Sequence, residues 1–188
     1  LPALTERRQD AAQRKRVADM TPEEKDRELL PSRRAGIWND RAYEEHERLP
    51  VQVSIDLDGL KWINDNLGHE AGDQLLRAMG EAIGAHTDLG YHISGDEFVL
   101  QAQTEDDARA LIERITENAE RATITVELSD GSRITKQGVG FSHGIGQDLS
   151  TAEAGLQRHK AERERLGARS ARGGEPAGVV RTPAEGQQ

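Results

Sequence analysis

The sequence predicts an α/β fold in which helices pack on one sheet. Short apolar or alternating runs typical of strands recur between longer segments that carry apolar residues at helical spacing. The chain has 188 residues, enough for one domain with a substantial core and some appended segments. Acidic residues follow two of the apolar runs, at Asp56 and Asp96. The sequence therefore predicts an acidic site at the ends of neighbouring strands.

The first predicted elements are helices. Thr21-Pro22-Glu23-Glu24 has the pattern of a capping box with proline at the first helical position, so a helix begins there. It ends near Leu30, because Pro31 disfavours helical geometry in the residue before it. A second short helix is expected over Asp40 to Arg48.

Strands and helices then alternate along the chain. Strands are expected at 51–55, 91–93, 98–102, 122–128 and 138–145. Helices are expected from about Leu60 to a break at Gly68, and over 71–83, 105–119 and 151–166. The second of these helices has an apolar core face formed by Leu75, Leu76, Met79 and Ile83. The second and third strands form a hairpin, and Asp130-Gly131 marks a later turn.

Composition divides the chain into three regions. Residues 1–20 are highly charged and form an N-terminal helix or linker. This region is either a solvated connecting helix or a signalling helix that pairs with a second copy. Residues 21–167 hold the alternating elements and form the main domain. Residues 168–188 are rich in Gly, Pro, Ala, Arg and Ser and are expected to be a disordered tail.

The overall composition excludes several classes of function. The net charge of −9 argues against a protein that coats nucleic acid, and aromatic residues make up only 3%, so the core is mostly aliphatic. The chain has no cysteine, which excludes disulfides, thiolate nucleophiles and zinc–thiolate sites. It has neither a signal-peptide pattern nor an apolar run of membrane length, so we expect a cytoplasmic segment without direct membrane contact. Because the chain begins at Leu1, we expect a fused or upstream regulatory region.

The acidic strand ends are candidate metal ligands. Hard divalent cations take oxygen ligands, and such ions hold nucleotide phosphates. Asp56 and Asp96 are therefore the first candidates, with Glu97 as an accessory. The alternative for either aspartate alone is a solvated strand end.

Three further positions suit a nucleotide. Lys61, five residues after Asp56, can hold a phosphate, although alone it also fits a surface lysine. Asn64 offers a donor and an acceptor to a purine edge, and Asp73 can accept from the ring N–H and amino group of guanine. Gly68-His69 also fits a helix break with a capping side chain.

The joint spacing of these residues resembles a known family. Asp56-Leu57-Asp58-Gly59-Leu60-Lys61-Trp62-Ile63-Asn64-Asp65, followed by Gly68-His69 and Gly72-Asp73, resembles the D-x-D-x-F-K-x-x-N-D…G-H…G-D signature of the GGDEF domain family. Ser94-Gly95-Asp96-Glu97-Phe98 resembles its namesake turn, with serine in place of the first glycine. The resemblance covers about residues 29 to 166, so the main domain is expected to be a GGDEF-like catalytic domain.

The resemblance implies a diguanylate cyclase, which condenses two GTP molecules into cyclic di-GMP and pyrophosphate. The implied fold is a single central, mostly antiparallel sheet flanked by helices, as in nucleotidyl cyclases and polymerase palm domains. The resemblance also implies two Mg²⁺ or Mn²⁺ ions per active site. It implies a homodimer as well, because one active site presents one GTP and the product is made from two. A catalytically weak or inactive GTP-binding regulatory module is the first alternative, and a related cyclase or transferase with another product is the second.

The resemblance also implies roles for individual residues. Asp56, the Leu57 carbonyl, Asp96 and Glu97 resemble the metal ligands. Asp96 is in addition the proposed base for the 3′-hydroxyl, with Glu97 and the phosphate-side Lys61 as the other catalytic residues. The substrate-binding positions correspond to Asn64, His69, Asp73, Ser94, Gly95 and Lys160.

Four departures from the family pattern stand out. The family's first motif, D-x-L-T-G-L-x-N-R, is reduced to Gly36, Ile37 and Asn39. The product-inhibition motif R-x-x-D reads Ala85-His86-Thr87-Asp88, so we predict no feedback inhibition through it. The arginine two residues before the namesake turn is His92. The arginine four residues after Lys160 is Glu164, and either Arg163 or Arg165 is the candidate to replace it.

Overall fold

The computed structural model describes residues 19, 21, 24, 35–171 and 173–186. The chain divides into two compact units, Leu1–Leu30 and Pro31–Gln188. In the first unit, the Glu24 N–H donates to the Thr21 hydroxyl at 3.2 Å, and the Thr21 N–H donates to the Glu24 carboxylate at 2.9 Å. This reciprocal pair is the predicted capping box. The predictions for residues 1–20 and for the end of this helix lie outside the described residues.

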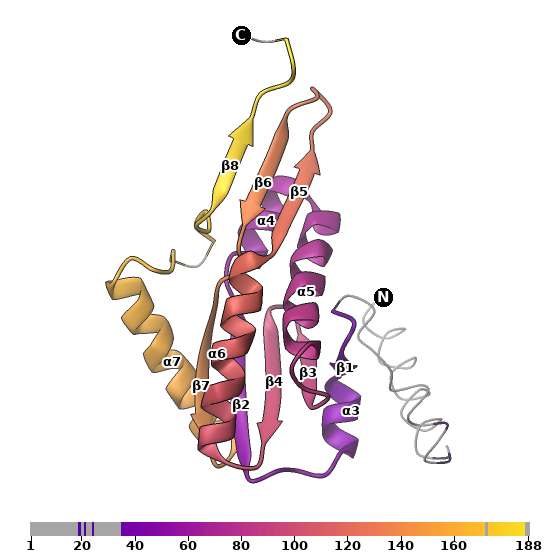
Figure 1. Ribbon diagram of the computed structural model, residues 1–188, viewed down its shortest axis with the longest axis vertical. Helices are drawn as coiled ribbons and strands as arrows, with labels where there is room; N and C mark the ends of the chain where they lie inside the picture. The colour runs from indigo at the N-terminus through magenta and orange to yellow at the C-terminus, as the bar shows by residue number, and fades with distance from the viewer. Residues whose placement is uncertain (1–18, 20, 22–23, 25–34, 172, 187–188) are drawn as a thin grey trace, which may run out of the picture. The chain divides into compact units, whose positions relative to one another are not determined.

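The second unit contains an α/β arrangement built on a central sheet (Figure 1). Its strands are β1 (Trp38–Asn39), β2 (Val51–Leu57), β3 (Gly90–Ser94), β4 (Glu97–Ala102), β5 (Thr123–Glu127), β6 (Arg133–Gln137), β7 (Phe141–Gly146) and β8 (Val179–Thr182). Its helices are α3 (Asp40–Glu45), α4 (Leu60–Leu67), α5 (His69–Gly84), α6 (Glu105–Arg121) and α7 (Leu149–Arg165).

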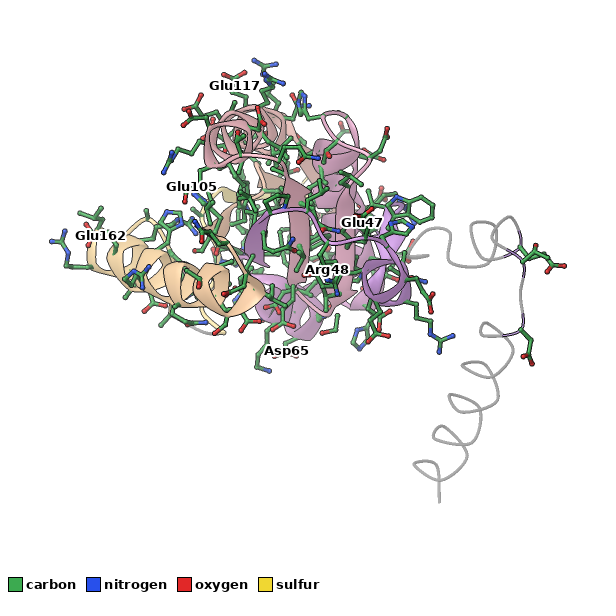
Figure 2. All side chains as sticks on the ribbon, turned by 90° about the horizontal axis from the view of Figure 1, so that it is seen from below. Glu47, Arg48, Asp65, Glu105, Glu117 and Glu162 are labelled. Carbon is green, nitrogen blue, oxygen red and sulfur yellow. The ribbon has the colours of Figure 1, made fainter. Side chains whose placement is uncertain are left out.

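The central sheet has the strand order β1-β3-β4-β2-β7. Every pair is antiparallel except β1–β3, so the predicted mostly antiparallel sheet flanked by helices is confirmed. All seven residues of β2 are buried, because this strand has a neighbour on each edge. Helices α5 and α6 lie together over one face, and α7 packs on β7 and β2 from the other (Figure 2).

A second, three-stranded sheet was not predicted. It has the order β5-β6-β8 and is antiparallel throughout. The predicted strand 122–128 corresponds to β5, whereas β6 is additional. The predicted strand 138–145 begins only at Phe141, since Gly138 has φ +72° and the Val139 N–H donates to the Ala119 carbonyl. The prediction of a disordered tail after residue 167 is wrong for the described part, because β8 hydrogen-bonds along β6.

Several helix boundaries differ from the predicted ones. Helix α3 ends at Glu45 rather than Arg48, because His46 is extended and its N–H caps the Ala42 carbonyl. Gly68, with φ +90°, ends α4 and begins α5, so α5 starts two residues earlier than predicted. Asp148 is the N-cap of α7, and its carboxylate accepts a hydrogen bond from the Thr151 N–H at 2.7 Å.

Candidate functional site

The two acidic strand ends lie together, as predicted. Strands β2 and β4 are antiparallel, and Asp56 is the register partner of Glu97. The Leu57 N–H donates to the Asp96 carbonyl oxygen at 2.8 Å and joins the end of β2 to the hairpin turn. Burial raises the pKa of the Asp96 carboxyl, and the negative charges of Asp56 and Glu97 raise it further. The turn therefore holds a carboxylate with increased proton affinity beside a second carboxylate.

The namesake turn is supported by its own side chains. Gly95 has φ +48°, a conformation that glycine adopts at little cost. An imidazole nitrogen of His92 lies 2.8 Å from the Gly95 carbonyl oxygen, so the residue in the arginine position braces the turn. The Ser94 hydroxyl donates to the exposed Glu97 carboxylate at 3.2 Å. Serine at the first position thus adds a contact within the hairpin.

Asp56 meets Lys160, one of the predicted substrate-binding residues. The Lys160 ammonium, from α7, lies 2.8 Å from Asp56 Oδ2. The other oxygen, Oδ1, is buried and has no hydrogen-bond partner among the described residues. A buried carboxylate oxygen that accepts no hydrogen bond fits a divalent cation, since hard cations take oxygen ligands. No three His, Cys, Asp or Glu side chains in the described ranges gather as a metal-binding group.

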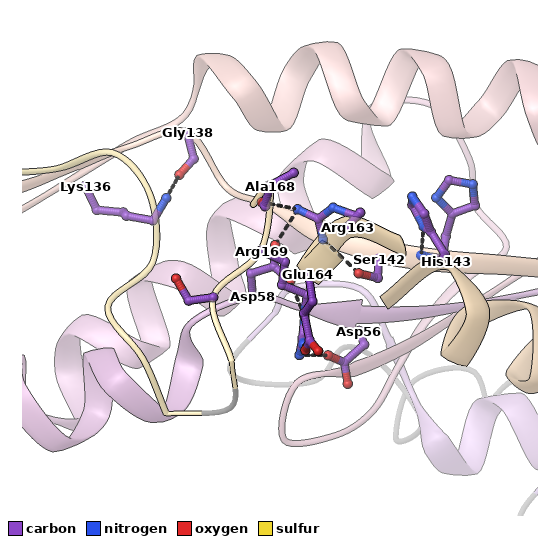
Figure 3. A network of polar contacts seen from close by, with 12 residues as sticks. Asp56, Asp58, Lys136, Gly138, Ser142, His143, Arg163, Glu164, Ala168 and Arg169 are labelled. Atoms are coloured by element: carbon purple, nitrogen blue, oxygen red, sulfur yellow. Dashed lines mark hydrogen bonds and ion pairs between the residues drawn. The ribbon is translucent and has the colours of Figure 1, made fainter. Parts of the chain in front are cut away.

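Asp58 is held by two arginines (Figure 3). Arg163 Nη2 lies 2.7 Å from Asp58 Oδ2, and Arg163 Nη1 donates to the Ser142 hydroxyl at 2.7 Å. Arg169 Nε lies 3.1 Å from Asp58 Oδ1, and Arg169 Nη2 lies 3.6 Å from Asp56 Oδ1. Glu164, which replaces the family arginine, forms an ion pair with Arg169. Three cations from α7 and the segment after it thus surround the two aspartates.

A cavity of about 350 Å³ opens beside this cluster. Its polar lining includes Asp58, Lys61, Asp96, Lys136, Arg163 and Arg169. Lys136 is buried, and its ammonium donates to the Gly138 carbonyl at 2.6 Å. Burial lowers the pKa of Lys136, an effect that the charge of Asp58 opposes. The cavity combines cations and carboxylates, as a site for a metal-bound polyphosphate requires.

The predicted nucleotide-contacting residues lie on the paired helices α4 and α5. Asn64 fits against Gly72, where a β-carbon would lie 1.8 Å from Asn64 Oδ1. Asp73 follows Gly72 and is half-buried, whereas His69 is exposed at the first position of α5. Lys61 lines the cavity and forms an exposed ion pair with Asp65 at 2.8 Å. The cavity lining does not include Asn64, His69 or Asp73.

Sequence reasoning missed Arg169 and Lys136. Of the two arginines proposed to replace the missing one, Arg163 reaches the site, whereas Arg165 is exposed and pairs with Glu162. Arg169 lies in the segment 168–188, for which the composition predicts a disordered tail. A signal for it existed, because the family motif has a glycine and an arginine shortly after the lysine, and here Gly167 and Arg169 follow α7. No comparable sequence signal marks Lys136.

Two named relatives are similar over part of the chain. Diguanylate cyclase DgcS of Shewanella oneidensis is 40% identical over 67 residues, which are 34% of this chain and 23% of DgcS. Probable diguanylate cyclase DgcT of Escherichia coli is 40% identical over 83 residues, which are 41% of this chain and 18% of DgcT. The chain thus spans less than a quarter of the length of either relative.

Solved structures share the fold. The diguanylate cyclase SiaD of Pseudomonas aeruginosa, solved with its activator SiaC, superposes with a TM-score of 0.56 at 23% identity, covering 85% of this chain and 73% of SiaD. The coiled coil and GGDEF domain of DgcB from Caulobacter crescentus, solved with c-di-GMP, gives a TM-score of 0.56 at 16% identity, covering 89% and 96%. At these identities the likeness establishes the fold alone.

In the described part of the chain, no helix combines the length and apolar character needed to cross a membrane.

The family model described as "Diguanylate cyclase, GGDEF domain" matches residues 27–165, which is well over half of the chain. The same stretch contains the signature residues on β2, α4 and α5 and the turn between β3 and β4. The chain therefore belongs to the GGDEF domain family.

Proposed function

We propose that the chain is a diguanylate cyclase that condenses two GTP molecules into cyclic di-GMP. The observation that carries the proposal is the meeting of Asp56 and Asp96 beside Lys160, with one buried Asp56 oxygen left without a hydrogen bond among the described residues. In each half-reaction, the 3′-oxygen of one GTP bonds to the α-phosphorus of the other. The bond from that phosphorus to its leaving oxygen breaks, and pyrophosphate departs.

Asp56, the Leu57 carbonyl, Asp96 and Glu97 are the residues proposed to hold two Mg²⁺ or Mn²⁺ ions. When bound, such ions lower the pKa of an attacking hydroxyl and neutralise charge on the departing pyrophosphate. Asp96 accepts the 3′-hydroxyl proton, a role that suits a carboxyl whose pKa is raised by burial. The cofactor assignment is supported by the donor set and by the buried Asp56 oxygen that accepts no hydrogen bond within the described residues.

The remaining residues are proposed to bind and orient GTP. Lys160, Lys61 and Arg163 lie on the phosphate side, while Asn64 and Asp73 read guanine. The Ser94-Gly95 backbone allows close approach of the nucleotide. Because cyclic di-GMP is two-fold symmetric, two protomers face each other in the active form. We further propose a cytoplasmic location and control by a region fused upstream.

A GTP-binding regulatory module without turnover is the second candidate. It is favoured by the occupation of Asp56 and Asp58 by Lys160, Arg163 and Arg169, because these cations compete with a metal ion for the same carboxylates. A related cyclase that forms another nucleotide product is a further possibility for the same site. Identification of the product distinguishes it from a diguanylate cyclase.

The test is incubation of the chain with GTP and Mg²⁺, followed by liquid chromatography and mass spectrometry. We expect cyclic di-GMP and pyrophosphate, and a loss of at least about 100-fold in rate with Asp96→Ala. Asp106→Ala is the matched control, because Asp106 is an exposed acid on α6. Full turnover in Asp96→Ala contradicts the mechanism. GTP binding by calorimetry without any product supports the regulatory module instead.

A further inference from the structure

The segment after α7 covers the phosphate side of the site. We name residues 167–171 and 173–178 the C-terminal cover. They supply much of the cavity lining, which also includes Leu57, Lys61 and Asp96. The cover is fixed at both ends, because α7 precedes it and β8 follows it. At the β8 end, the Gln137 N–H donates to the Gly178 carbonyl at 2.8 Å.

An ionic contact joins the cover to the acidic strand end. The Arg169 side chain is only 13% exposed and lies 3.1 Å from Asp58 and 3.6 Å from Asp56. Its guanidinium places positive charge beside the Asp56 oxygen that has no hydrogen-bond partner among the described residues. The contact therefore neutralises the carboxylates that a cationic ligand of this site would also need.

An apolar contact joins the cover to the start of α4. Pro176 is buried, and a β-carbon on Gly59 would lie 2.6 Å from Pro176 Cβ and Cγ. Gly59 is the N-cap of α4 and receives no side-chain cap within the described residues. A helix N-terminus favours an anion, and a proline ring offers no acceptor to its N–H groups. A polyphosphate is therefore a better partner for this helix end than the cover is.

We propose that the C-terminal cover is an autoinhibitory strap, held by Arg169, which substrate phosphates displace. The proposal rests on the proposed function for the identity of the displacing ligand. The strap and the phosphates compete for the same loop, Asp58 to Lys61, because Pro176 lies on Gly59. Release of Arg169 removes one cation from Asp56 and from Asp58, which keep their ion pairs with Lys160 and Arg163. Strand β8 keeps the far end of the strap attached to β6.

The first test requires no nucleotide. Since the chain has no cysteine, Pro176→Cys introduces a single thiol at a buried position. We expect the thiol to react slowly with a thiol reagent, and about tenfold faster when Arg169→Ala is added, because the ionic contact is lost. Arg165→Ala is the charge-matched control, since Arg165 pairs only with exposed Glu162 in the described structure. Equal reaction rates in all three proteins overturn the proposal that Arg169 holds the strap.

The second test adds the ligand. GTP with Mg²⁺ is expected to raise the reaction rate of the introduced thiol in proportion to the occupied fraction. In the unmodified chain, GTP with Mg²⁺ is expected to increase amide hydrogen exchange over 173–178, a readout that is independent of the substitution. Increased protection of this segment overturns the strap, because it would mean that the cover closes on the nucleotide.

Turnover separates a strap from a binding element. Arg169→Ala is expected to tighten GTP binding and to raise the rate of product formation several-fold. A tenfold loss of GTP affinity would instead make Arg169 a phosphate ligand and overturn the autoinhibitory role. If Arg169→Ala exposes the introduced thiol while GTP neither binds nor reacts, the role of Arg169 in holding the strap is supported. The proposed cyclase function is then contradicted.

Discussion

Arg163 and Asp58 stand 105 residues apart in sequence and meet at 2.7 Å. The pair ties α7 to the loop after β2. The Ser142 hydroxyl accepts a hydrogen bond from Nη1 of the same guanidinium. Both side chains are largely buried, with 17% and 12% exposure. The contact thus fixes the position of the helix that carries Lys160 relative to the strand that carries Asp56.

A double-mutant cycle on Arg163→Ala and Asp58→Ala should show strong coupling. Because the pair is mostly withdrawn from water, we expect a coupling of about 1–2 kcal/mol in the free energy of urea unfolding. The exposed pair of Arg109 and Glu105, at 2.9 Å, is the control and should couple by less than about 0.5 kcal/mol. Similar couplings for the two pairs contradict the structural role of Arg163.

Gly144→Ala should destabilise the fold. A β-carbon there would lie 2.0 Å from the Ala152 carbonyl oxygen and 2.1 Å from the Leu156 nitrogen, both in the α7 backbone. Backbone atoms cannot rotate away, so we expect a loss of about 3 kcal/mol in unfolding free energy. Gly84→Ala is the control, because among the described residues its β-carbon meets only Ile37, at 3.5 Å, and it should be neutral or stabilising by about 0.5 kcal/mol.

Gly72→Ala should weaken GTP binding more than it weakens the fold. The new methyl group would occupy the position of Asn64 Oδ1, and this side chain can rotate away without moving the backbone. If Asn64 reads guanine, the KM for GTP should rise about tenfold, with a smaller change in kcat and in melting temperature. An unchanged KM in a folded Gly72→Ala protein contradicts the role of Asn64.

Acid should destabilise the fold through His143. Burial lowers the pKa of His143 to about 4, helped by the positive charges of His159 and Arg163. The folded-state pKa lies below the ordinary value of 6.5, so the unfolded chain takes up a proton first as the pH falls. The stability contributed by neutral His143 is thus complete above about pH 6.5 and is lost as the pH falls toward 4.

We expect a loss of about 1–2 kcal/mol in unfolding free energy between pH 7 and about pH 5 from this group. His143→Asn should reduce the loss, as measured by urea unfolding at both pH values. The comparison isolates His143 because Asp96, whose pKa is raised, acts in the opposite direction and is present in both proteins. An identical pH dependence in the two proteins would contradict the assignment.

Cyclic di-GMP should not inhibit this chain through the family's product motif. Ala85, exposed at the end of α5, replaces the arginine that would bind a phosphate. Initial rates should be unchanged by added product, apart from competition at the active site. Ala85→Arg should introduce tight product binding, measured by calorimetry. Strong non-competitive inhibition of the unmodified chain would contradict this expectation.

The elements that local sequence predicted are those whose signal lies in their own residues. The apolar run of β2 and the helical periodicity of α5 and α6 were placed to within a few residues. Strand β8 was missed because three of its four residues are exposed and its pattern is not that of a buried strand. Its conformation depends on hydrogen bonds to β6, a partner that sequence reading had not identified as a strand.

The site residues likewise divide into those with a local sequence signal and those that depend on a distant partner. Asp56, Asp96 and Lys160 belong to motifs with recognisable spacing, and the structure brings them together. Arg169 lies in a charged, glycine-containing segment, and its partner Asp58 is 111 residues away. Only the three-dimensional arrangement joins them. Glu164, at the position where the family has arginine, pairs with this same residue.

The position of β2 between β4 and β7 sets the order in which the chain can complete its fold. One edge of this strand pairs with β4, at residues 97–102, and the other pairs with β7, at residues 141–146. During synthesis, the second backbone edge of this strand therefore stays unpaired until about ninety further residues have emerged, and distant pairings of this kind close slowly. A nascent chain stopped before β7 would expose that edge to other strands, so the ribosome-bound intermediate can aggregate through it.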